Sequence, residues 1–286
     1  MQRQNFRCVH RLRVRWAEVD MQKIVFNAHY LMYIDTAMSD YWRALALPYE
    51  ASMQTLGGEM YVKKATLEYH ASAKLDDTLE VGLRCARIGN TSSLFEAGTF
   101  SGNKLLVSGE LVYVFANAST QAPTPLPPAL RAMFEGFEAG ADMVEARTGD
   151  WNALGRDAGR LRTAVFVREQ GIAADVEADA LDASARHAVL YNRLGQPVAT
   201  GRLLQQAPGV GRIGRMAVDR SVRGAQWGRV LLNTLMEAAR ARGDQQVQLH
   251  AQCSAQGFYQ RAGFVVAGEP YQEAGIAHVL MARDFE

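Results

Sequence analysis

The chain has few cysteines and prolines and almost no net charge. Its 286 residues include three cysteines and eight prolines, and 31 basic side chains offset 30 acidic ones. Cys8, Cys85 and Cys253 are widely spaced, with no CxxC pair, which argues against a disulfide framework and a zinc site. The near-neutral charge gives no electrostatic footprint for nucleic acid. We therefore expect a protein of a reducing compartment that holds no metal and binds no nucleic acid.

Long hydrophobic runs are also missing. Residues 1–16 lack the apolar core of a signal peptide, and no later run reaches the length of a membrane span. The hydrophobic fraction of 48% and the charged fraction of 21% are typical of globular proteins. These features predict a cytoplasmic protein without a membrane partner, and the length suits two domains.

Proline is concentrated in one place. Four of the eight prolines lie in ASTQAPTPLPP, residues 118–128, an extended stretch that is poorly suited to a core. We predict a first domain over 1–120, a Pro-rich linker with a connecting helix over 121–150, and a second domain over 151–286. No repeat relates the two halves, so the domains are expected to be unlike each other.

The first half has the pattern of an α+β domain. Apolar residues alternate with arginines over 10–16, and a broad apolar stripe recurs at helical spacing over 28–45. Strand-like runs follow at 61–69, 78–88, 92–100 and 105–116. One long helix followed by an antiparallel meander predicts a sheet that wraps around the helix.

The second half has the pattern of a mixed α/β domain, built around a strand, turn and helix over 211–243. In the turn RGAQWGR, Gly224 and Gly228 lie just ahead of the helix start, where free N–H groups and the helix dipole favour an anion such as pyrophosphate. An ordinary glycine-loosened turn is the alternative. Further helices are predicted at 161–170 and 254–262, and further strands at 187–192, 198–205, 246–251 and 277–282.

Several segments of the second half resemble the GNAT family of acyl-CoA-dependent N-acyltransferases. RGAQWG resembles motif A, with Arg223 and Gly228 at the outer positions and Gln226 in place of the middle glycine. GFYQRAGF, residues 257–264, resembles motif B. RTAVFVREQG, HAQ and EAGIAHVLM are similar to a bacterial branch whose amine substrates are mostly unassigned. The resemblance implies a GNAT fold that transfers an acyl group from acetyl-CoA, or another acyl-CoA, to an amine.

The resemblance also implies roles for particular residues. The backbone of 214–218, including Met216, Ala217 and Val218, is expected to bind the pantetheine arm and the thioester carbonyl. The pyrophosphate is expected on the loop formed by Arg223, Gly224, Ala225, Gln226, Trp227, Gly228 and Arg229. Tyr259 is expected to be the general acid toward the thiolate, with a half-buried aromatic that has a polar tip as the alternative.

The remaining groups for amine acylation are not identified by sequence. Residue type makes His250, Glu273 and His278 candidates for the general base, although strand-like positions favour structural roles for both histidines. Four carboxylates could bind an amine, but we interpret their segment as a solvated loop: Glu169, Glu177, Asp179 and Asp182.

The opening of the first half resembles the hot-dog-fold thioesterases of the 4-hydroxybenzoyl-CoA and YbgC type. The similarity is clearest in VRWAEVDMQKIVFNAHYLMYID and extends over residues 8–118. It implies that Asp20 attacks the thioester or activates water, with backbone N–H groups of 26–29 as oxyanion donors. A turn or capping role is the alternative for Asp20.

The first half departs from this family at two positions. Lys23 stands where the family often has glycine, and is expected to close the turn or reach an acyl-CoA phosphate; Asn27 stands where it often has His or Tyr. We interpret His29 as a helix residue and Glu18 as solvated.

Together the halves predict a bifunctional enzyme that hydrolyses an acyl-CoA thioester and transfers an acyl group to an amine. Hot-dog thioesterases form dimers and often tetramers, so the resemblance implies a homodimer or homotetramer assembled through 1–120. The alternative is a CoA-ligand-binding sensor or assembly protein, for which Lys23 and Gln226 are the supporting features. Acyl carrier protein thioesters are a further possible substrate of the first half.

Overall fold

The computed structural model describes residues 1–285, which fall into two compact units. The first is Met1–Met143 and the second begins at Val144, and each has its own sheet. The segment 121–150, predicted as a linker, spans this division. Its helix α3 (Pro128–Glu138) lies in the first unit, and its strand β6 (Val144–Gly149) opens the second.

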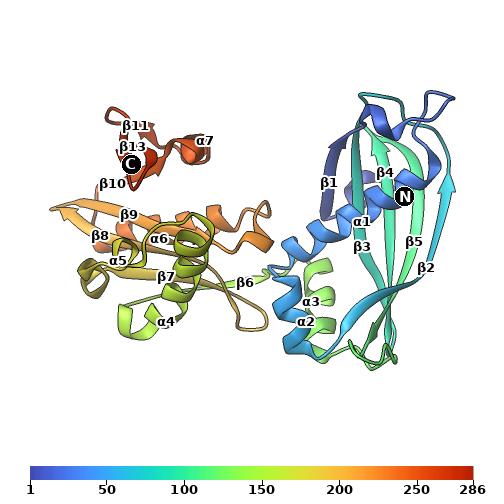
Figure 1. Ribbon diagram of the computed structural model, residues 1–286, viewed down its shortest axis with the longest axis horizontal. Helices are drawn as coiled ribbons and strands as arrows, with labels where there is room; N and C mark the ends of the chain where they lie inside the picture. Colours follow the sequence, from blue (N-terminus) through green and yellow to red (C-terminus); the bar gives the residue numbers. More distant parts are fainter. Residues whose placement is uncertain (286) are drawn as a thin grey trace. The chain divides into compact units, whose positions relative to one another are not determined.

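The first unit is a five-stranded antiparallel sheet with a long helix against it, as predicted. Figure 1 shows helix α1 (Asn27–Ala44) running along the sheet, whose order is β1-β3-β4-β5-β2. Helix α2 (Tyr49–Leu56) was not predicted. The strands are β1 (Cys8–Arg13), β2 (Glu59–Tyr69), β3 (Thr78–Ile88), β4 (Ser92–Ser101) and β5 (Lys104–Ala116).

The apolar stripe of α1 explains its place on the sheet. Its buried residues recur at three- and four-residue intervals, and each large apolar side chain contributes about 1.5–3 kcal/mol on burial. Gly109 of β5 allows close approach, because a Cβ there would lie 3.3 Å from Ile34 Cδ1. The stripe consists of Tyr30, Tyr33, Ile34, Ala37, Met38, Tyr41 and Trp42.

Helix α3 completes this core. The ring of Phe134 lies 5.5 Å from that of Phe95, and the Tyr41 hydroxyl donates to Glu138 Oε1 at 2.7 Å. The Pro-rich stretch before α3 is held as well, since the Leu126 N–H donates to the Asn90 carbonyl at 2.8 Å. The C-terminal part of the first unit, including the Pro-rich stretch and α3, therefore packs against its core.

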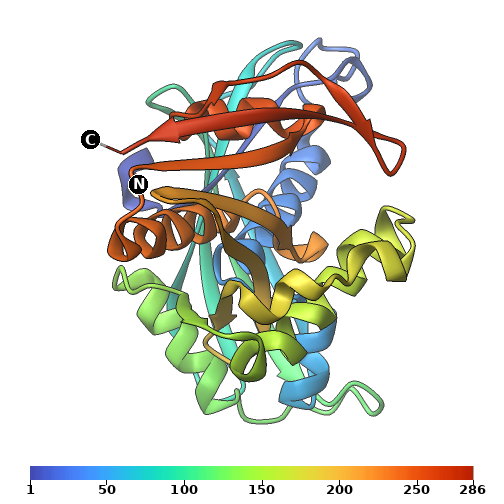
Figure 2. The same cartoon turned by 90° about the vertical axis from the view of Figure 1, so that its left-hand side faces the viewer.

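The second unit has a mixed sheet of order β11-β13-β10-β9-β8-β7-β6, in which only β9 and β10 run parallel. Every residue of Val198–Leu204 is buried, so both faces of the central strand β8 are covered. Figure 2 shows the long strand β13 beside β10. The strands are β7 (Arg186–Asn192), β8 (Pro197–Ala207), β9 (Val210–Val218), β10 (Gln246–Gln252), β11 (Val265–Val266), β12 (Tyr271–Glu273) and β13 (Ile276–Asp284).

The helices of this unit differ from the prediction mainly at the start. The helix predicted at 161–170 begins earlier, as α4 (Trp151–Arg162), because the Asp150 side chain caps it by accepting from the Ala153 N–H at 2.9 Å. It continues as a π-helical turn, η3 (Thr163–Glu169). The other helices are α5 (Ala174–Glu177), α6 (Trp227–Arg242) and α7 (Gln256–Arg261). None of the helices within residues 1–285 is long and apolar enough to span a bilayer.

Candidate functional site

In the first unit the chain reverses in a tight turn ahead of α1. Val19 bridges Val25, the Asp20 N–H donates to the Ile24 carbonyl, and the Lys23 N–H donates back to the Asp20 carbonyl, both at 2.9 Å. Lys23 has a φ of 64°, in the left-handed region that favours glycine. The lysine thus adopts the conformation for which a glycine would be suited, and its backbone closes the turn.

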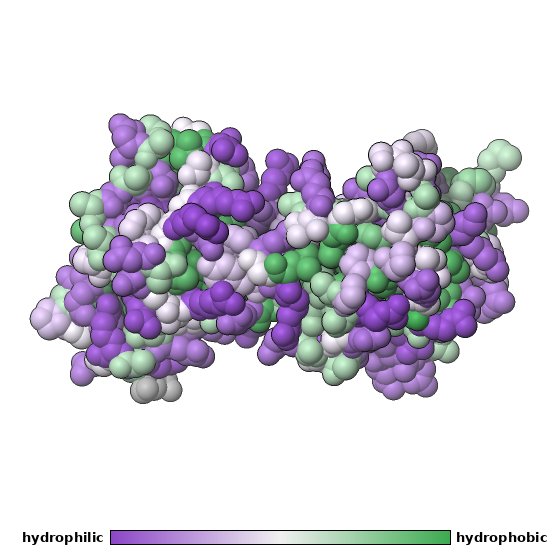
Figure 3. Space-filling view, turned by 90° about the horizontal axis from the view of Figure 1, so that it is seen from below, coloured by the Kyte–Doolittle hydropathy of each residue, from purple (hydrophilic) through white to green (hydrophobic). Residues whose placement is uncertain are grey.

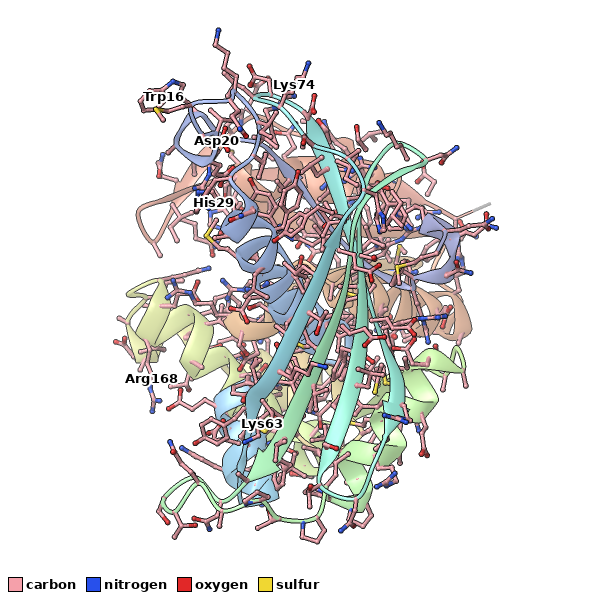
Figure 4. The ribbon with its side chains drawn as sticks, turned by 90° about the vertical axis from the view of Figure 1, so that its right-hand side faces the viewer. Trp16, Asp20, His29, Lys63, Lys74 and Arg168 are labelled. Carbon is pink, nitrogen blue, oxygen red and sulfur yellow. The ribbon has the colours of Figure 1, made fainter. Side chains whose placement is uncertain are left out.

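The Asp20 side chain lies in this turn and lines an open cavity. Its Oδ1 accepts the Gln22 N–H at 2.8 Å, as expected for a turn residue, while Oδ2 has no hydrogen bond within residues 1–285. The cavity is about 610 Å³ and is also lined by Phe26, Asn27, Tyr30 and Tyr69. Figure 4 labels Asp20 above the start of α1, where His29 is also labelled. One carboxylate oxygen therefore holds the turn and the other remains available.

Two of the four predicted oxyanion donors are already engaged. The Phe26 N–H donates to the Glu18 carbonyl and the His29 N–H to the Phe26 carbonyl, both at 2.9 Å. The N–H groups of Asn27 and Ala28 have no acceptor in the part of the chain that the structure describes. As first-turn N–H groups, they point out of the N-terminus of α1 and form the positive end of the helix dipole.

Glu18 is buried rather than solvated, so that prediction is wrong. It is 3% exposed and accepts hydrogen bonds from the Arg15 N–H and the Tyr33 hydroxyl, both at 2.8 Å, and from the Arg15 guanidinium. Burial alone would raise the pKa of Glu18, but these hydrogen bonds outweigh it and lower the pKa. His29 stacks on Tyr33, with ring centroids 6.5 Å apart. Glu18 thus anchors the turn that carries Asp20.

In the second unit, strands β9 and β10 separate part of the way along. They pair only from Val210 and Gln246 to Ile213 and Leu249, so β9 from Gly214 onward is unpaired on that side. On the other side the register with β8 shifts, and Arg215 has a φ of 52°. Within the predicted segment 214–218, the Val218 carbonyl already accepts from Arg223 Nε at 3.0 Å. The divergence leaves main chain near Met216 open to a ligand.

The loop before α6 has the geometry of an anion site. The N–H groups of Gly224, Ala225, Gln226 and Gly228 have no acceptor among the described residues. Gln226, where the GNAT motif has glycine, has a φ of 67° and precedes the helix. Several free N–H groups at a helix N-terminus favour a phosphate group.

Arg223 braces this loop. Its guanidinium makes a two-pronged ion pair with Glu169, at 2.6 and 2.7 Å. The hydrogen bonds from Arg223 lower the pKa of Glu169. The side chain of Arg223 therefore connects the loop to the π-helical turn, whereas that of Arg229 is exposed and makes no ion pair within residues 1–285.

A cavity of about 400 Å³ lies where β9 and β10 part. Tyr259 lines it together with Gly214, Met216 and Leu249, and its hydroxyl lies 3.8 Å from Met216 Sδ. Burial raises the pKa of Tyr259 to about 12. The phenol therefore remains protonated at neutral pH and is a hydrogen-bond donor at the point where the strands diverge.

The acidic segment is part of an ion-pair network, so its interpretation as a solvated loop is wrong. Glu177 and Asp182 are 7% and 5% exposed, and both bond to the buried guanidinium of Arg162. Asp182 and Asp179 each also accept from Arg202 Nη1, at 2.7 Å. With Glu169 on Arg223, all four carboxylates that were candidates for amine binding are paired with arginines.

The three candidate bases line the same cavity, joined by a residue that the sequence analysis missed. His250, Glu273 and His278 all lie on its wall. Tyr271 hydrogen-bonds to His250 Nδ1 at 2.5 Å and to Glu273 Oε2 at 3.3 Å. The short strand β12 gives no periodic signal, which is why Tyr271 was not predicted. Within the described chain, this cavity included, no cluster of three or more His, Cys, Asp or Glu side chains could hold a metal ion.

Comparison with known proteins divides the chain in the same way. The family model described as "Acetyltransferase (GNAT) domain" matches residues 156–285, and the one described as "Thioesterase-like superfamily" matches residues 14–134. The uncharacterized N-acetyltransferase YjcF of Bacillus subtilis is 35% identical over 130 residues, 45% of this chain and 91% of that protein. Protein ElaA of Escherichia coli is 37% identical over 131 residues, 44% of this chain and 84% of that protein.

A solved structure matches too. A thioesterase of Thermus thermophilus, complexed with coenzyme A and Zn, is 24% identical with a TM-score of 0.42, covering 47% of this chain and 97% of that one. GNAT and thioesterase-like domains in general act on acyl-CoA, by acyl transfer and by hydrolysis. With its two matched domains, the chain belongs to the GNAT acetyltransferase family through its C-terminal half and carries a thioesterase-like, hot-dog domain in its N-terminal half.

Proposed function

We propose that this chain is a bifunctional acyl-CoA enzyme: the first unit hydrolyses an acyl-CoA thioester, and the second transfers an acetyl or other acyl group from CoA to an amine. One observation supports this for both units. In each, backbone N–H groups without an acceptor in the described chain lie at a helix N-terminus. In the first unit they belong to Asn27 and Ala28, beside the cavity that Asn27 lines. In the second they lie in the loop before α6, which follows the part of β9 that lines the other cavity. Such groups suit the oxyanion in the first unit and the pyrophosphate in the second.

The hydrolytic step is assigned to Asp20. The thioester carbonyl oxygen would accept from the Asn27 and Ala28 N–H groups while Asp20 Oδ2 attacks the carbonyl carbon or takes a proton from attacking water. The C–S bond then breaks and its electron pair leaves on the CoA sulfur, which takes up a proton. Where Asp20 is the nucleophile, water then hydrolyses the resulting acyl anhydride on Asp20 and releases the acid. One oxyanion donor of this kind is typically worth about 2.7–4 kcal/mol of transition-state stabilisation.

The transfer step is assigned to the cavity between β9 and β10. The loop 223–229 would bind the pyrophosphate, the backbone near Met216 would hold the pantetheine arm, and Tyr259 would donate its proton toward the leaving thiolate. No metal is required by this arrangement. The arginine-paired carboxylates are not assigned to the amine.

We propose that the first unit assembles with a second copy of the chain, as a homodimer or homotetramer. Strand β2 is the edge of its sheet, and its Val62 and Tyr69 are 50% and 52% exposed. Hydrophobic residues reach the surface among hydrophilic ones on the face drawn in Figure 3. An unpaired edge strand with exposed apolar side chains favours pairing with another strand.

The thioesterase assignment is tested by Asp20→Asn, which keeps the shape of the side chain and removes its charge. We expect kcat for release of CoA from an acyl-CoA panel to fall by roughly 10²-fold or more, because both proposed roles need the carboxylate. Asp76→Asn is the matched control: Asp76 is exposed and its φ of 67° suits asparagine. If Asp20→Asn released CoA with the kcat of the wild type, the assignment would be refuted.

A sensor or assembly role remains the second candidate, since Lys23 and Gln226 replace glycines at both proposed sites. This alternative predicts acyl-CoA binding without CoA release, whether or not amines are added. Measuring CoA release with and without acceptor amines separates the two functions.

A further inference from the structure

The cavity of the second unit has a side that acyl-CoA binding does not use. It is lined by Arg212 of β9, His250 of β10, Glu273 of β12 and His278 of β13. In the strand register, Arg212 of β9 lies opposite Gln248 of β10. His250 is two residues further along β10, so Arg212 and His250 occupy the same face of the sheet. This side also carries His250 of the HAQ segment and Glu273 and His278 of the EAGIAHVLM segment, the three candidate bases.

A hydrogen-bond chain fixes the proton positions on His250. Glu273 Oε2 accepts from the Tyr271 hydroxyl, because a carboxylate has no proton to give. Because the Tyr271 hydroxyl proton is donated to Glu273, the Tyr271 oxygen accepts a hydrogen bond from His250 Nδ1–H, 2.5 Å away. His250 Nε2 is then unprotonated, and it has no hydrogen bond within residues 1–285. The imidazole therefore presents a lone pair.

Burial, together with the charges around it, favours the neutral form of His250. Burial lowers the pKa of His250 from its ordinary value of 6.5, and so do Arg212 and His278, while Glu273 acts in the opposite direction. The imidazole is therefore mostly in its base form at neutral pH. Its protonated form, once made, has the carboxylate of Glu273 within reach through Tyr271.

Arg212 is an unpaired cation on the same wall. Its guanidinium has no ion pair or hydrogen bond in the part of the chain described, whereas Arg202 and Arg215, which also line the cavity, are paired with Asp179. Arg212 lies six residues before Val218, about 20 Å along the strand, which places it far from the phosphate loop. A planar guanidinium suits a carboxylate bidentately.

We propose that the acceptor of the second unit is a primary amine that also carries a carboxylate, with Arg212 binding the carboxylate and His250 acting as the general base. The lone pair of the amine nitrogen attacks the thioester carbonyl carbon, and His250 Nε2 takes a proton from that nitrogen. The C–N bond forms, the C–S bond breaks, and its electron pair leaves on the sulfur of CoA, which is then protonated. Tyr271 and Glu273 are positioning residues. This inference rests on the proposed transfer function.

An amine panel with acetyl-CoA tests the substrate class, with the N-acetyl product quantified by mass spectrometry so that hydrolysis does not interfere. We expect β-alanine to be acetylated with higher kcat/KM than propylamine or putrescine. Arg212→Gln should lower kcat/KM for β-alanine by roughly 10-fold or more and leave that for propylamine little changed. Arg156→Gln, a surface arginine whose side chain is 95% exposed, is the matched control. Equal or better use of propylamine by the wild type overturns the substrate assignment.

The base is tested by His250→Gln and by pH profiles. His250→Gln should lower kcat by roughly 10²-fold with little change in acetyl-CoA affinity. The wild-type kcat/KM should rise with pH through a His250 pKa below 6.5. The inflection should move to lower pH in Glu273→Gln, which removes the anion, and to higher pH in Arg212→Gln, which removes the cation. Unmoved inflections, or an unchanged kcat in His250→Gln, overturn the assignment.

Two measurements separate failure of this inference from failure of the proposed function. Nitrogen NMR of His250 in the full chain should show the Nδ1–H tautomer, and Tyr271→Phe should shift it toward Nε2–H. An Nε2–H tautomer in the wild type contradicts the hydrogen-bond chain whatever the activity. Calorimetry with acetyl-CoA alone tests the transferase proposal, since loss of the acceptor chemistry would leave that binding intact.

Discussion

At the scale of single residues, the two departures from the resembled families share one physical property. Lys23 and Gln226 each stand where the family pattern has glycine, and each has a positive φ, 64° and 67°. The sequence identified these positions, but it could not show that the backbone keeps the glycine conformation with a side chain present. Both residues therefore adopt a glycine-like backbone conformation at an energetic cost.

That cost can be measured. A left-handed conformation costs a non-glycine residue roughly 1–2 kcal/mol, and glycine loses about 0.5–1 kcal/mol in backbone entropy. We expect Lys23→Gly and Gln226→Gly each to stabilise its unit by up to about 1 kcal/mol, read from urea unfolding. Gln22→Gly is the matched control, since Gln22 is exposed and its φ is not positive. It should destabilise; a Lys23→Gly variant no more stable than wild type would contradict this reasoning.

Sequence reasoning selected part of the proposed site and missed the rest. Asp20 and Tyr259 were proposed from the family resemblance, and His250 was one of three candidate bases chosen by residue type. Tyr271 could not, because its contacts with His250 come from a hairpin between β12 and β13. Glu18 was interpreted as solvated because its partner Tyr33 is fifteen residues away on α1.

At the scale of elements, the arginine network holds the segment 174–182 against the sheet. Arg202 of β8 and Arg162 of α4 share Asp182, and Asp179 accepts from both Arg202 and Arg215 of β9. Removing one partner of a buried pair typically costs 3–5 kcal/mol, since the other charge remains buried. Glu177, Asp179 and Arg202 line the cavity between β9 and β10, so the network fixes one wall of it.

This network predicts an acid-sensitive contribution to stability. The hydrogen bonds from Arg202 lower the pKa of Asp179 from 3.8 to about 2. Because the folded-state pKa is depressed, the contribution is fully present above 3.8 and is lost as the pH falls toward 2. It amounts to at most about 2 kcal/mol, because Asp179 is partly exposed and solvent screens the ion pair. We expect urea unfolding of the second unit to lose less stability between pH 6 and about pH 2.5 in Asp179→Asn than in wild type.

Asp175→Asn serves as the control for that experiment, since Asp175 lies on the same segment and is exposed. An Asp179→Asn variant with the acid sensitivity of the wild type would show that the network contributes nothing to it.

Sequence periodicity predicted elements in proportion to their length. The four long strands of the first unit and helix α1 were predicted almost to the residue, because their apolar positions repeat many times. Helix α2 and strands β6 and β12 were missed, since they are short or lack an apolar pattern. Helix α4 was placed too late, because its N-terminal part includes Gly155 and Gly159 and has little apolar signal.

At the scale of the whole molecule, length and composition predicted two domains, with a Pro-rich linker and connecting helix over 121–150. The units divide between Met143 and Val144, within that segment, and its helix α3 belongs to the first unit. Helix α3 packs on Tyr41 and Phe95 of the first unit, and periodicity shows only that a helix has an apolar face, not which sheet it covers.

The central claim is that each unit binds an acyl-CoA thioester, and titration calorimetry with a non-hydrolysable acyl-CoA thioether on the full chain tests it most directly. We predict two binding sites per chain in the wild type and one in Gly228→Glu. A carboxylate in the phosphate loop repels the pyrophosphate. The variant should still fold, because residue 228 lies in the first turn of α6, where a negative charge is favourable. A folded wild-type chain that binds one equivalent, or none, would contradict the account.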